Sequence, residues 1–377
     1  MNKKELELYV HIPFCVKKCD YCDFLSFSCS DEAKVSYTRA LLKEIDSQPD
    51  MEDYQVVSIF FGGGTPSLME IDLMQKITEQ IRGKFHISDQ AEITLEANPG
   101  TLTMEKLQAY LQMGFNRISI GCQSLSNTEL IRLGRIHTAE EFYESFLLAR
   151  NAGFDNINVD LMSALPGQTF ENWERNLREM ADLAPEHISA YSLILEERTP
   201  FFQKQCDLDL PDEDTERLMY EKTQDILREY GYHQYEISNY AKAGYECRHN
   251  IGYWKRVPYL GFGLGASSLK NEERYSNTSD WKEYLKKSDR PESIKKSCEK
   301  LSRKDQIEEY MILGLRMNCG VSEKDFSGQF GCTFDDIYHD VINKYVKTGY
   351  MQRTEGKITL TRKGISVSNI IMADFIL

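Results

Sequence analysis

The sequence predicts an α/β protein with a parallel sheet, followed by a small carboxyl-terminal domain of helices and one hairpin. The first observation is an alternation of strand-like and helical runs, with a period of roughly 30 residues, that continues to about residue 240. The second is a change of pattern near residue 303, where helices precede a hairpin. Repeated βα units indicate a parallel sheet covered by helices, which is either doubly wound or rolled into a barrel.

Each element follows from its local pattern. β-rich runs predict strands at 6–12, 56–61, 91–97, 116–121, 156–162 and 187–195. Helical periodicity predicts helices at 31–47, 70–84, 103–113, 138–152, 170–182 and 212–230. The polar segment 271–302 predicts a linker with one short helix. Three further helical patterns, a hairpin over 349–361 and a last apolar helix predict an α+β module that is winged-helix-like.

Charge and composition exclude several classes of function. The 377 residues carry a net charge of −14, which argues against nucleic acid as a general electrostatic partner. The helix predicted over 333–346 has three aspartates where a DNA-binding helix would be basic, so we interpret the small module as a structural or interaction domain. Scattered cysteines, a charged amino terminus and the absence of an apolar run of 18 residues predict a cytoplasmic protein.

Three cysteines near the amino terminus carry the strongest chemical signal. Cys15, Cys19 and Cys22 have the spacing Cys-x3-Cys-x2-Cys. Three thiolates in so short a run can each ligate one iron of a cubic 4Fe-4S cluster, which leaves the fourth iron open to a small molecule. A zinc site is the alternative, but zinc sites usually draw ligand pairs from two separated places, and no second Cys-x2-Cys pair occurs.

This motif resembles that of the radical S-adenosylmethionine (SAM) superfamily, in which the open iron binds SAM and an electron from the cluster releases a deoxyadenosyl radical. The resemblance implies a partial (β/α)6 barrel with the cluster loop at the carboxyl end of the first strand. The glycine-rich run Phe61–Ser67 follows the second strand, and its bare amides can approach a ligand closely. It resembles the element found in the oxygen-independent coproporphyrinogen III oxidase-like branch, and implies Gly63, Gly64 and Thr65 as SAM contacts.

Polar residues close the later strands and continue the match. Carboxyl ends of barrel strands converge on one mouth, where carboxylates suit ribose hydroxyls or an ammonium group and an arginine suits a carboxylate. The positions are Glu96, Gln123, Arg135 and Asp160. In the resembling enzymes these positions contact SAM, as does Tyr9, and Tyr21 contributes through its backbone.

Two departures separate the chain from coproporphyrinogen dehydrogenases. Those enzymes carry a fourth nearby cysteine where this chain has Phe24, and they have an extension ahead of the cluster motif, which here begins at residue 11. Dehydrogenase activity is therefore not expected. Oxygen-independent coproporphyrinogen III dehydrogenation, or another radical SAM oxidoreduction, is the alternative function.

A second motif, Cys247-Arg-His249-Asn250-Ile-Gly-Tyr253-Trp254, points to heme. A histidine can ligate heme iron and aromatic rings can pack on the macrocycle. The residues alone favour a loop histidine satisfied beside core aromatics, and Cys247 is a rival ligand. In the ligand reading, Asn250 orients the imidazole. The pattern resembles that of the HemW proteins, the heme chaperones of the same branch, which deliver heme to membrane respiratory enzymes.

Together these observations predict a heme chaperone on a scaffold that binds a 4Fe-4S cluster and SAM. The expected division is a radical SAM barrel over 1–240, a heme-motif loop and linker over 241–302, and the winged-helix-like module over 303–377. His249 is the candidate axial ligand. The resemblance implies recipient apo-hemoproteins among membrane respiratory enzymes, peripheral association with the inner face of the membrane, and a homodimer.

Overall fold

One large sheet and one small sheet contain the strands of the computed structural model, which describes residues 3–49 and 51–377. The large sheet contains β1 (Lys4–Ile12), β2 (Tyr54–Gly63), β3 (Ile87–Ala97), β4 (Arg117–Gln123), β5 (Ile157–Ser163), β6 (His187–Ser192), β7 (His233–Gln234), β8 (Asn239–Ala241), β9 (Tyr259–Phe262), β10 (Ser267–Lys270), β11 (Glu273–Asn277) and β12 (Lys295–Lys300). The small sheet contains β13 (Val321–Ser322), β14 (Met351–Thr354) and β15 (Lys357–Leu360).

The helices alternate with the strands as the sequence predicts. Along the large sheet they are α1 (Asp31–Asp46), the 3-10 turn η1 (Pro66–Leu68), α2 (Ile71–Lys84), α3 (Met104–Gln112), α4 (Asn127–Arg132), α5 (Ala139–Ala152), α6 (Phe170–Asp182), α7 (Pro200–Gln203), η2 (Gln205–Asp207), α8 (Glu213–Glu229), α9 (Arg248–Trp254), α10 (Trp281–Lys287) and α11 (Pro291–Ile294). The carboxyl-terminal domain has α12 (Arg303–Gly314), α13 (Glu323–Phe330), α14 (Phe334–Lys347), α15 (Arg362–Ile365) and α16 (Ser368–Ala373).

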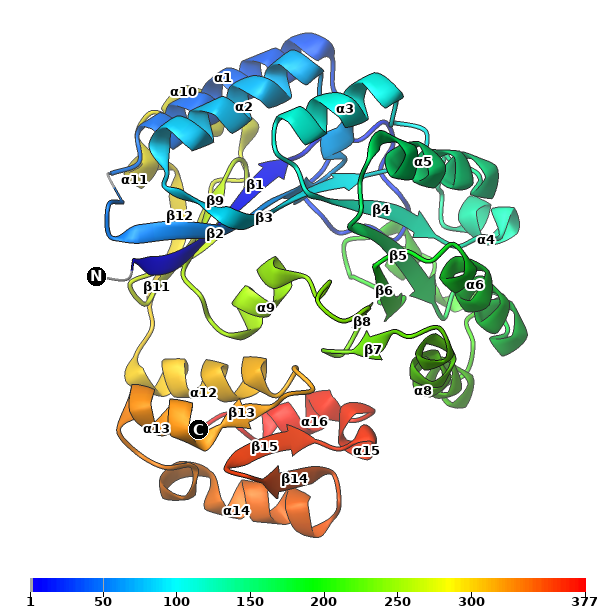
Figure 1. Cartoon of the computed structure of the whole chain (residues 1–377), viewed down its shortest axis with the longest axis vertical. Coiled ribbons are helices and arrows are strands. Elements are labelled where there is room, and N and C mark those ends of the chain that lie inside the picture. Colours follow the sequence, from blue (N-terminus) through cyan, green and yellow to red (C-terminus); the bar gives the residue numbers. More distant parts are fainter. Residues whose placement is uncertain (1–2, 50) are drawn as a thin grey trace.

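The large sheet is an open barrel. Its strand order is β12-β11-β10-β9-β1-β2-β3-β4-β5-β6-β8-β7, and β1 to β6 run parallel, each beside the next along the chain. The sheet curves, and helices cover its outer side (Figure 1). Because β7 and β12 end the order without pairing to each other, the barrel does not close. The predicted partial (β/α)6 barrel is confirmed.

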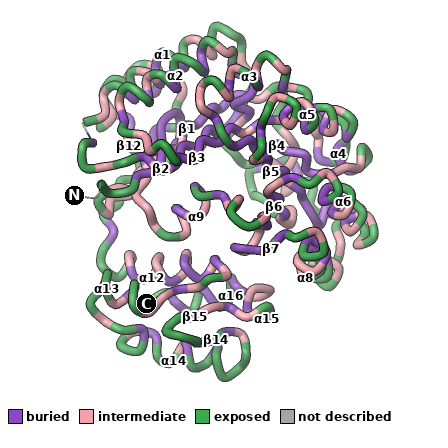
Figure 2. The backbone as a smooth tube through the Cα atoms, in the orientation of Figure 1, coloured by how far each residue is buried: buried purple, intermediate pink, exposed green. Residues whose placement is uncertain are grey.

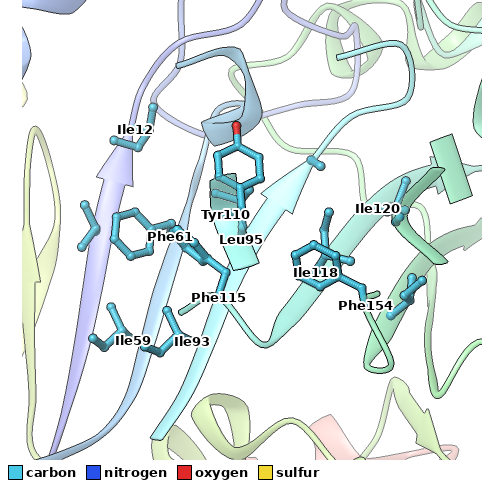
Figure 3. Close-up of a cluster of buried hydrophobic side chains, with 14 of the residues drawn as sticks. Ile12, Ile59, Phe61, Ile93, Leu95, Tyr110, Phe115, Ile118, Ile120 and Phe154 are labelled. Atoms are coloured by element: carbon cyan, nitrogen blue, oxygen red, sulfur yellow. The ribbon is translucent and has the colours of Figure 1, made fainter. Parts of the chain in front are cut away.

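Alternation along the strands separates the core from the site. Successive side chains of a strand point to opposite faces of the sheet. In β1 the even-numbered residues Leu6, Leu8, Val10 and Ile12 are buried in the main hydrophobic core. Figure 3 shows part of this core, where the rings of Phe61 and Phe115 lie 5.0 Å apart. The intervening residues of β1 face the inner side.

The inner side of the barrel holds a helix. In Figure 1, α9 lies on the inner side of the curved sheet, between β2 and the carboxyl-terminal domain. Glu7 of β1 is buried there, and a Cβ at Gly252 of α9 would collide with the Glu7 carboxyl group. The absence of a side chain at residue 252 therefore lets α9 approach the sheet closely.

The helices begin at side-chain caps. The hydroxyls of Ser30, Thr103 and Thr169 accept hydrogen bonds from backbone N–H groups in the first turns of α1, α3 and α6. Thr138 and Glu141 form a reciprocal capping box at the start of α5. These bonds satisfy donors that the first turn of a helix cannot pair internally, and they explain why the predicted starts agree closely with the structure.

The structure differs from the sequence prediction over 271–302. Instead of a linker with one short helix, this segment forms β11, α10, α11 and β12, and the two strands extend the edge of the large sheet. Most residues of β12 are exposed. A polar edge strand has neither a buried face nor an apolar alternation, so the sequence carries no strand signal there.

The carboxyl-terminal domain has a hydrophobic core of its own. Helices α12, α13 and α14 and the sheet β13-β15-β14 enclose buried residues such as Phe326 and Ile358. Figure 2 shows these buried segments facing the interior of the domain. Arg256 joins the domain to the barrel through an ion pair with Glu309 of α12. The described residues form no helix that is both long and apolar enough to cross a bilayer.

Candidate functional site

Three thiols line a cavity of about 330 Å³ at the carboxyl end of the parallel strands. The loop with Cys15, Cys19 and Cys22 begins after β1. Cys15 Sγ accepts a hydrogen bond from Thr65 Oγ1 at 3.6 Å, and Cys19 Sγ accepts one from Arg135 Nη1 at 3.7 Å. Burial raises the pKa of Cys22. One donor that follows β2 and one from the loop after α4 therefore reach two of the three sulfurs, and such donors favour thiolates.

The thiols suit a cluster better than a single ion. Among residues 3–49 and 51–377, no three His, Cys, Asp or Glu side chains surround one point as ligands of one metal ion do. A cubic 4Fe-4S cluster takes each thiolate on a different iron, so three cysteines spaced around one cavity are the donor set it needs. A tetrahedral zinc site would require its ligands to converge.

The glycine-rich loop after β2 reaches the same cavity. Gly63 has a φ of +108°, and a Cβ there would collide with the imidazole ring of His11. Its N–H donates a hydrogen bond to Glu96 Oε2 at 3.1 Å. Gly64 also lines the cavity, whereas Thr65 acts through the Cys15 sulfur and through Asn98, whose Nδ2 donates to Thr65 Oγ1 at 2.7 Å.

Two half-buried carboxyl groups line the cavity. Glu96 closes β3, and Asp160 lies in β5. Burial, together with the charge of Asp160, raises the pKa of Glu96 to about 8. Burial also raises the pKa of Asp160, although Asn158 and Ser119 donate hydrogen bonds to it. A ligand with an ammonium group would favour the ionised form of both carboxyl groups.

Arg135 is held among neutral acceptors and a thiol. Its Nη2 donates to Asn98 Oδ1 at 2.9 Å and to the Gly121 carbonyl at 2.7 Å, and its Nη1 donates to Cys19 Sγ. The sequence interpretation overlooked Asn98, although Asn98 stands two residues after Glu96 in the same strand-end run. The position of the residue at a predicted strand end was the available signal.

Gln123, Tyr21 and a further tyrosine, Tyr191, also line the first cavity. Gln123 has a φ of +69°, an uncommon conformation for a non-glycine residue, at an irregularity in the pairing of β4 with β5. Its Oε1 accepts a hydrogen bond from Tyr191 OH at 2.9 Å. Tyr191 lies within the sixth predicted strand, over 187–195, and was not singled out from the sequence. Tyr21 lines the cavity beside Arg135.

Tyr9 lies apart from this group. It lines a second cavity of about 650 Å³, and its hydroxyl bonds His11 Nδ1 at 3.1 Å. The His11 Nε2 donates to the Leu25 carbonyl at 2.9 Å, so Nδ1 is the acceptor for the tyrosine proton. The other predicted SAM contacts gather at the first cavity or on its cysteines.

The second cavity is aromatic. Its lining comes from β1, α9, β9, β10, β11 and α12, and includes Tyr9, His11, Phe24, Tyr253, Trp254, Tyr259, Arg274 and Leu313. The rings of Tyr253 and Tyr259 meet edge to face, with centroids 4.7 Å apart. Phe24 lines both cavities. The sequence interpretation named Tyr253 and Trp254 as aromatic neighbours of His249, but it assigned Arg274 to a linker.

His249 does not line either cavity. It is buried, and its ring stacks on Phe60 with centroids 5.1 Å apart. Nδ1 bonds Ser58 Oγ at 2.8 Å and Nε2 bonds Tyr253 OH at 3.0 Å. Burial and the positive charge of Arg117 lower its pKa to about 3, so the ring is neutral. Both ring nitrogens are therefore engaged within the protein.

The two residues expected to act beside His249 lie elsewhere. Asn250 lines the first cavity, and the imidazole is oriented by Ser58 and Tyr253 instead. This corrects the expectation that Asn250 orients the ring. Cys247 is fully buried, where its thiol donates to Glu92 Oε1 and burial raises its pKa.

Comparison with known proteins identifies the family. Residues 9–180 match the family model of the radical SAM superfamily, and residues 301–367 match the HemN C-terminal domain. A protein of Lactococcus lactis named heme chaperone HemW is 37% identical over 100% of this chain and 99% of its own length. The heme chaperone HemW of Bacillus subtilis is 36% identical over 98% of each chain. The chain belongs to the HemW family of radical SAM proteins.

A solved structure shares the fold of this HemW-family chain. Coproporphyrinogen III oxidase (HemN) from Escherichia coli superposes with a TM-score of 0.87 at 24% identity, over 100% of this chain and 91% of that one. Membership of the radical SAM superfamily implies a 4Fe-4S cluster and SAM. The residues of the first cavity fit both groups, because its lining includes three thiols, which can ligate a cluster, and two carboxyl groups, which can bind an ammonium group.

Proposed function

We propose that this HemW-family protein binds heme and passes it to apo-hemoproteins. The observation that carries the proposal is the aromatic cavity of about 650 Å³, which lies within the range of small-molecule and cofactor sites. Tyrosine and tryptophan rings can pack against a porphyrin macrocycle, and a propionate group could replace Glu309, which forms an ion pair with the Arg274 guanidinium at 2.6 Å. The names of the relatives, which align along the whole chain, support the same ligand.

The first cavity serves as the cofactor-binding half of the protein. In this proposal Cys15, Cys19 and Cys22 hold the cluster, and Glu96 and Asp160 face the ammonium group of SAM. When bound, the cluster supplies the electron that cleaves SAM. The residues of this chain position both groups: Thr65 and Arg135 donate hydrogen bonds to the sulfurs, and Gly63 holds Glu96 in place.

The two cavities adjoin at Phe24, so the occupancy of the first can alter the shape of the second. We propose that the cluster and SAM set the heme-binding state in this way. The recipients are proposed to be apo-hemoproteins of the respiratory chain, met by a cytoplasmic homodimer at the inner face of the membrane.

An anaerobic hemin titration of the full-length, cluster-reconstituted protein tests the function. A saturable change in the Soret band at about one hemin per chain is expected. Hemin-loaded protein should then transfer its heme to apomyoglobin, as measured by the myoglobin spectrum. Absence of saturable binding would overturn the proposal.

The alternative function is coproporphyrinogen III dehydrogenation, because the chain shares its fold with coproporphyrinogen III oxidase (HemN). Incubation of the reduced protein with SAM and coproporphyrinogen III distinguishes the two. The chaperone proposal expects no decarboxylated porphyrinogen. Stoichiometric SAM consumption with formation of that product would replace it by the enzymatic function.

A further inference from the structure

The hydrogen bonds around His249 determine which proton each ring nitrogen carries. Ser58 Oγ donates to Glu7 Oε1 at 2.9 Å, so Ser58 Oγ accepts the hydrogen bond from His249 Nδ1. Nε2 is then the acceptor, and the Tyr253 hydroxyl donates to it. The imidazole is sealed beneath Phe60 and bonded at both nitrogens. To reach iron, it would have to leave a buried position and break both bonds.

Tyr253, unlike His249, lines the aromatic cavity. It is half-buried and bonds the imidazole through its hydroxyl. Its ring meets that of Tyr259, which in turn accepts a hydrogen bond from Arg274. A tyrosine that can supply oxygen, a second aromatic ring and a guanidinium paired with Glu309 thus contact one another in sequence beside one cavity, and these are groups that the iron, macrocycle and propionates of a heme can use.

We propose that the phenol oxygen of Tyr253, and not the imidazole of His249, is the iron ligand in this cavity, with His249 as the positioning residue behind it. Tyrosine is an established type of heme ligand. An oxygen lone pair of Tyr253 forms the bond to ferric iron, the O–H bond of the phenol breaks, and the proton passes to His249 Nε2. The ligand is then a phenolate beside an imidazolium, and the iron does not change oxidation state. The inference rests on the proposed heme-binding function.

A second tyrosine–histidine pair in the same cavity provides a matched control. Tyr9 also lines the cavity and also bonds a histidine, His11. Tyr9 stands on β1, where its ring stacks on Phe60, whereas the Tyr253 ring contacts Tyr259, which accepts a hydrogen bond from Arg274. The proposal therefore assigns the iron to Tyr253, and a Tyr9→Phe variant removes an equivalent hydroxyl without removing the ligand.

The test is resonance Raman and EPR spectroscopy of the full-length protein with one equivalent of hemin. Wild-type protein should show phenolate ring vibrations and a high-spin ferric signal. Tyr253→Phe should lose the phenolate vibrations, whereas Tyr9→Phe should keep them. His249→Gln should keep them at shifted frequencies, and His249→Ala should bind hemin about 10–100-fold more weakly, as expected for a group that orients a metal ligand. Circular dichroism verifies the fold of each variant.

The outcomes separate this inference from the proposed function. A wild-type protein that binds no hemin overturns the proposed function itself. A wild-type protein that binds hemin with a low-spin imidazole spectrum, lost in His249→Ala, overturns only the assignment to Tyr253. Phenolate vibrations that persist in Tyr253→Phe and vanish in Tyr9→Phe overturn it in favour of the other pair.

Discussion

The cavity at the barrel mouth and the aromatic cavity share Phe24 but are built in different ways. The first is lined by charged and polar groups at the ends of successive strands, and its donors lie close to the cysteine sulfurs. The second is about twice as large and combines residues from β1 with others from α9 to α12. A repeated local unit specifies the first, whereas contacts between distant segments specify the second. The same mouth can therefore serve proteins whose inner cavities take different ligands.

Loss of the cluster should have the largest effect, and it tests whether the two cavities are independent. Cys19→Ala removes one of three thiolates, so iron should fall from about four per chain to nearly none. Because Phe24 lines both cavities, loss of the cluster should also change hemin affinity, by about 0.5–3 kcal/mol, as is usual for neighbouring sites that are coupled. Iron analysis and hemin titration check both effects. Unchanged hemin affinity in the cluster-free variant would contradict the proposal that the cluster sets the heme-binding state.

The electrostatics of the mouth give the next largest effect. Because the pKa of Glu96 is about 8, the carboxyl group is mostly protonated at pH 7 in the free protein. An ammonium ligand requires the carboxylate, so SAM binding at pH 7 should release a proton, and affinity should rise as the pH rises toward 8. Calorimetry in two buffers of different ionisation enthalpy measures the release. Glu96→Gln should abolish it and weaken binding by about 1.5–3 kcal/mol. Hemin binding is the control and should not change.

The position of α9 gives a third test, directed at the aromatic cavity. A methyl group in Gly252→Ala would meet the Glu7 carboxyl group, so the variant should lose about 1–3 kcal/mol of unfolding free energy and bind hemin more weakly. Gly83→Ala is the matched control, because nothing lies within 4 Å of its added Cβ in α2 and alanine favours a helix by about 0.5–1 kcal/mol. Denaturant unfolding measures both. Equal stability of the two variants would show that α9 does not need this close approach.

The smallest effect is expected where the cavities meet. Phe24 is 69% exposed, so Phe24→Ala should weaken hemin binding and SAM binding by about 1 kcal/mol or less each. Paired titrations, each with and without the other ligand, check this. If the affinity for either ligand is unchanged by the substitution, Phe24 does not border both sites in solution.

Much of the mouth cavity was predictable. The βα period placed β1 to β6 within a few residues, and the strand-end rule grouped Glu96, Gln123 and Asp160 correctly at one edge. The same rule would have found Asn98, which directly follows a predicted strand, but not Tyr191, which lies within the strand predicted over 187–195. Alternation along β1 also predicts that Tyr9 faces the inner side of the sheet. It does not predict which inner cavity Tyr9 lines.

The aromatic cavity was far less predictable. Arg274 stands on β11, which lies between β10 and β12 and whose polar residues resemble a linker, and Leu313 comes from the other domain. The motif around His249 correctly drew attention to α9. It did not reveal that the helix turns the imidazole toward Ser58 and presents Tyr253 to the cavity.

The sequence by itself determined the barrel, the three thiols, the polar strand ends and the family, because each depends on local spacing with a fixed period. Only the tertiary structure decided the surroundings of His249 and the lining of the aromatic cavity. The orientation of α9 depends on Glu7, Ser58 and Phe60, and each of these residues precedes the helix by more than 180 residues. No local pattern in the helix encodes which of its side chains those residues will bury.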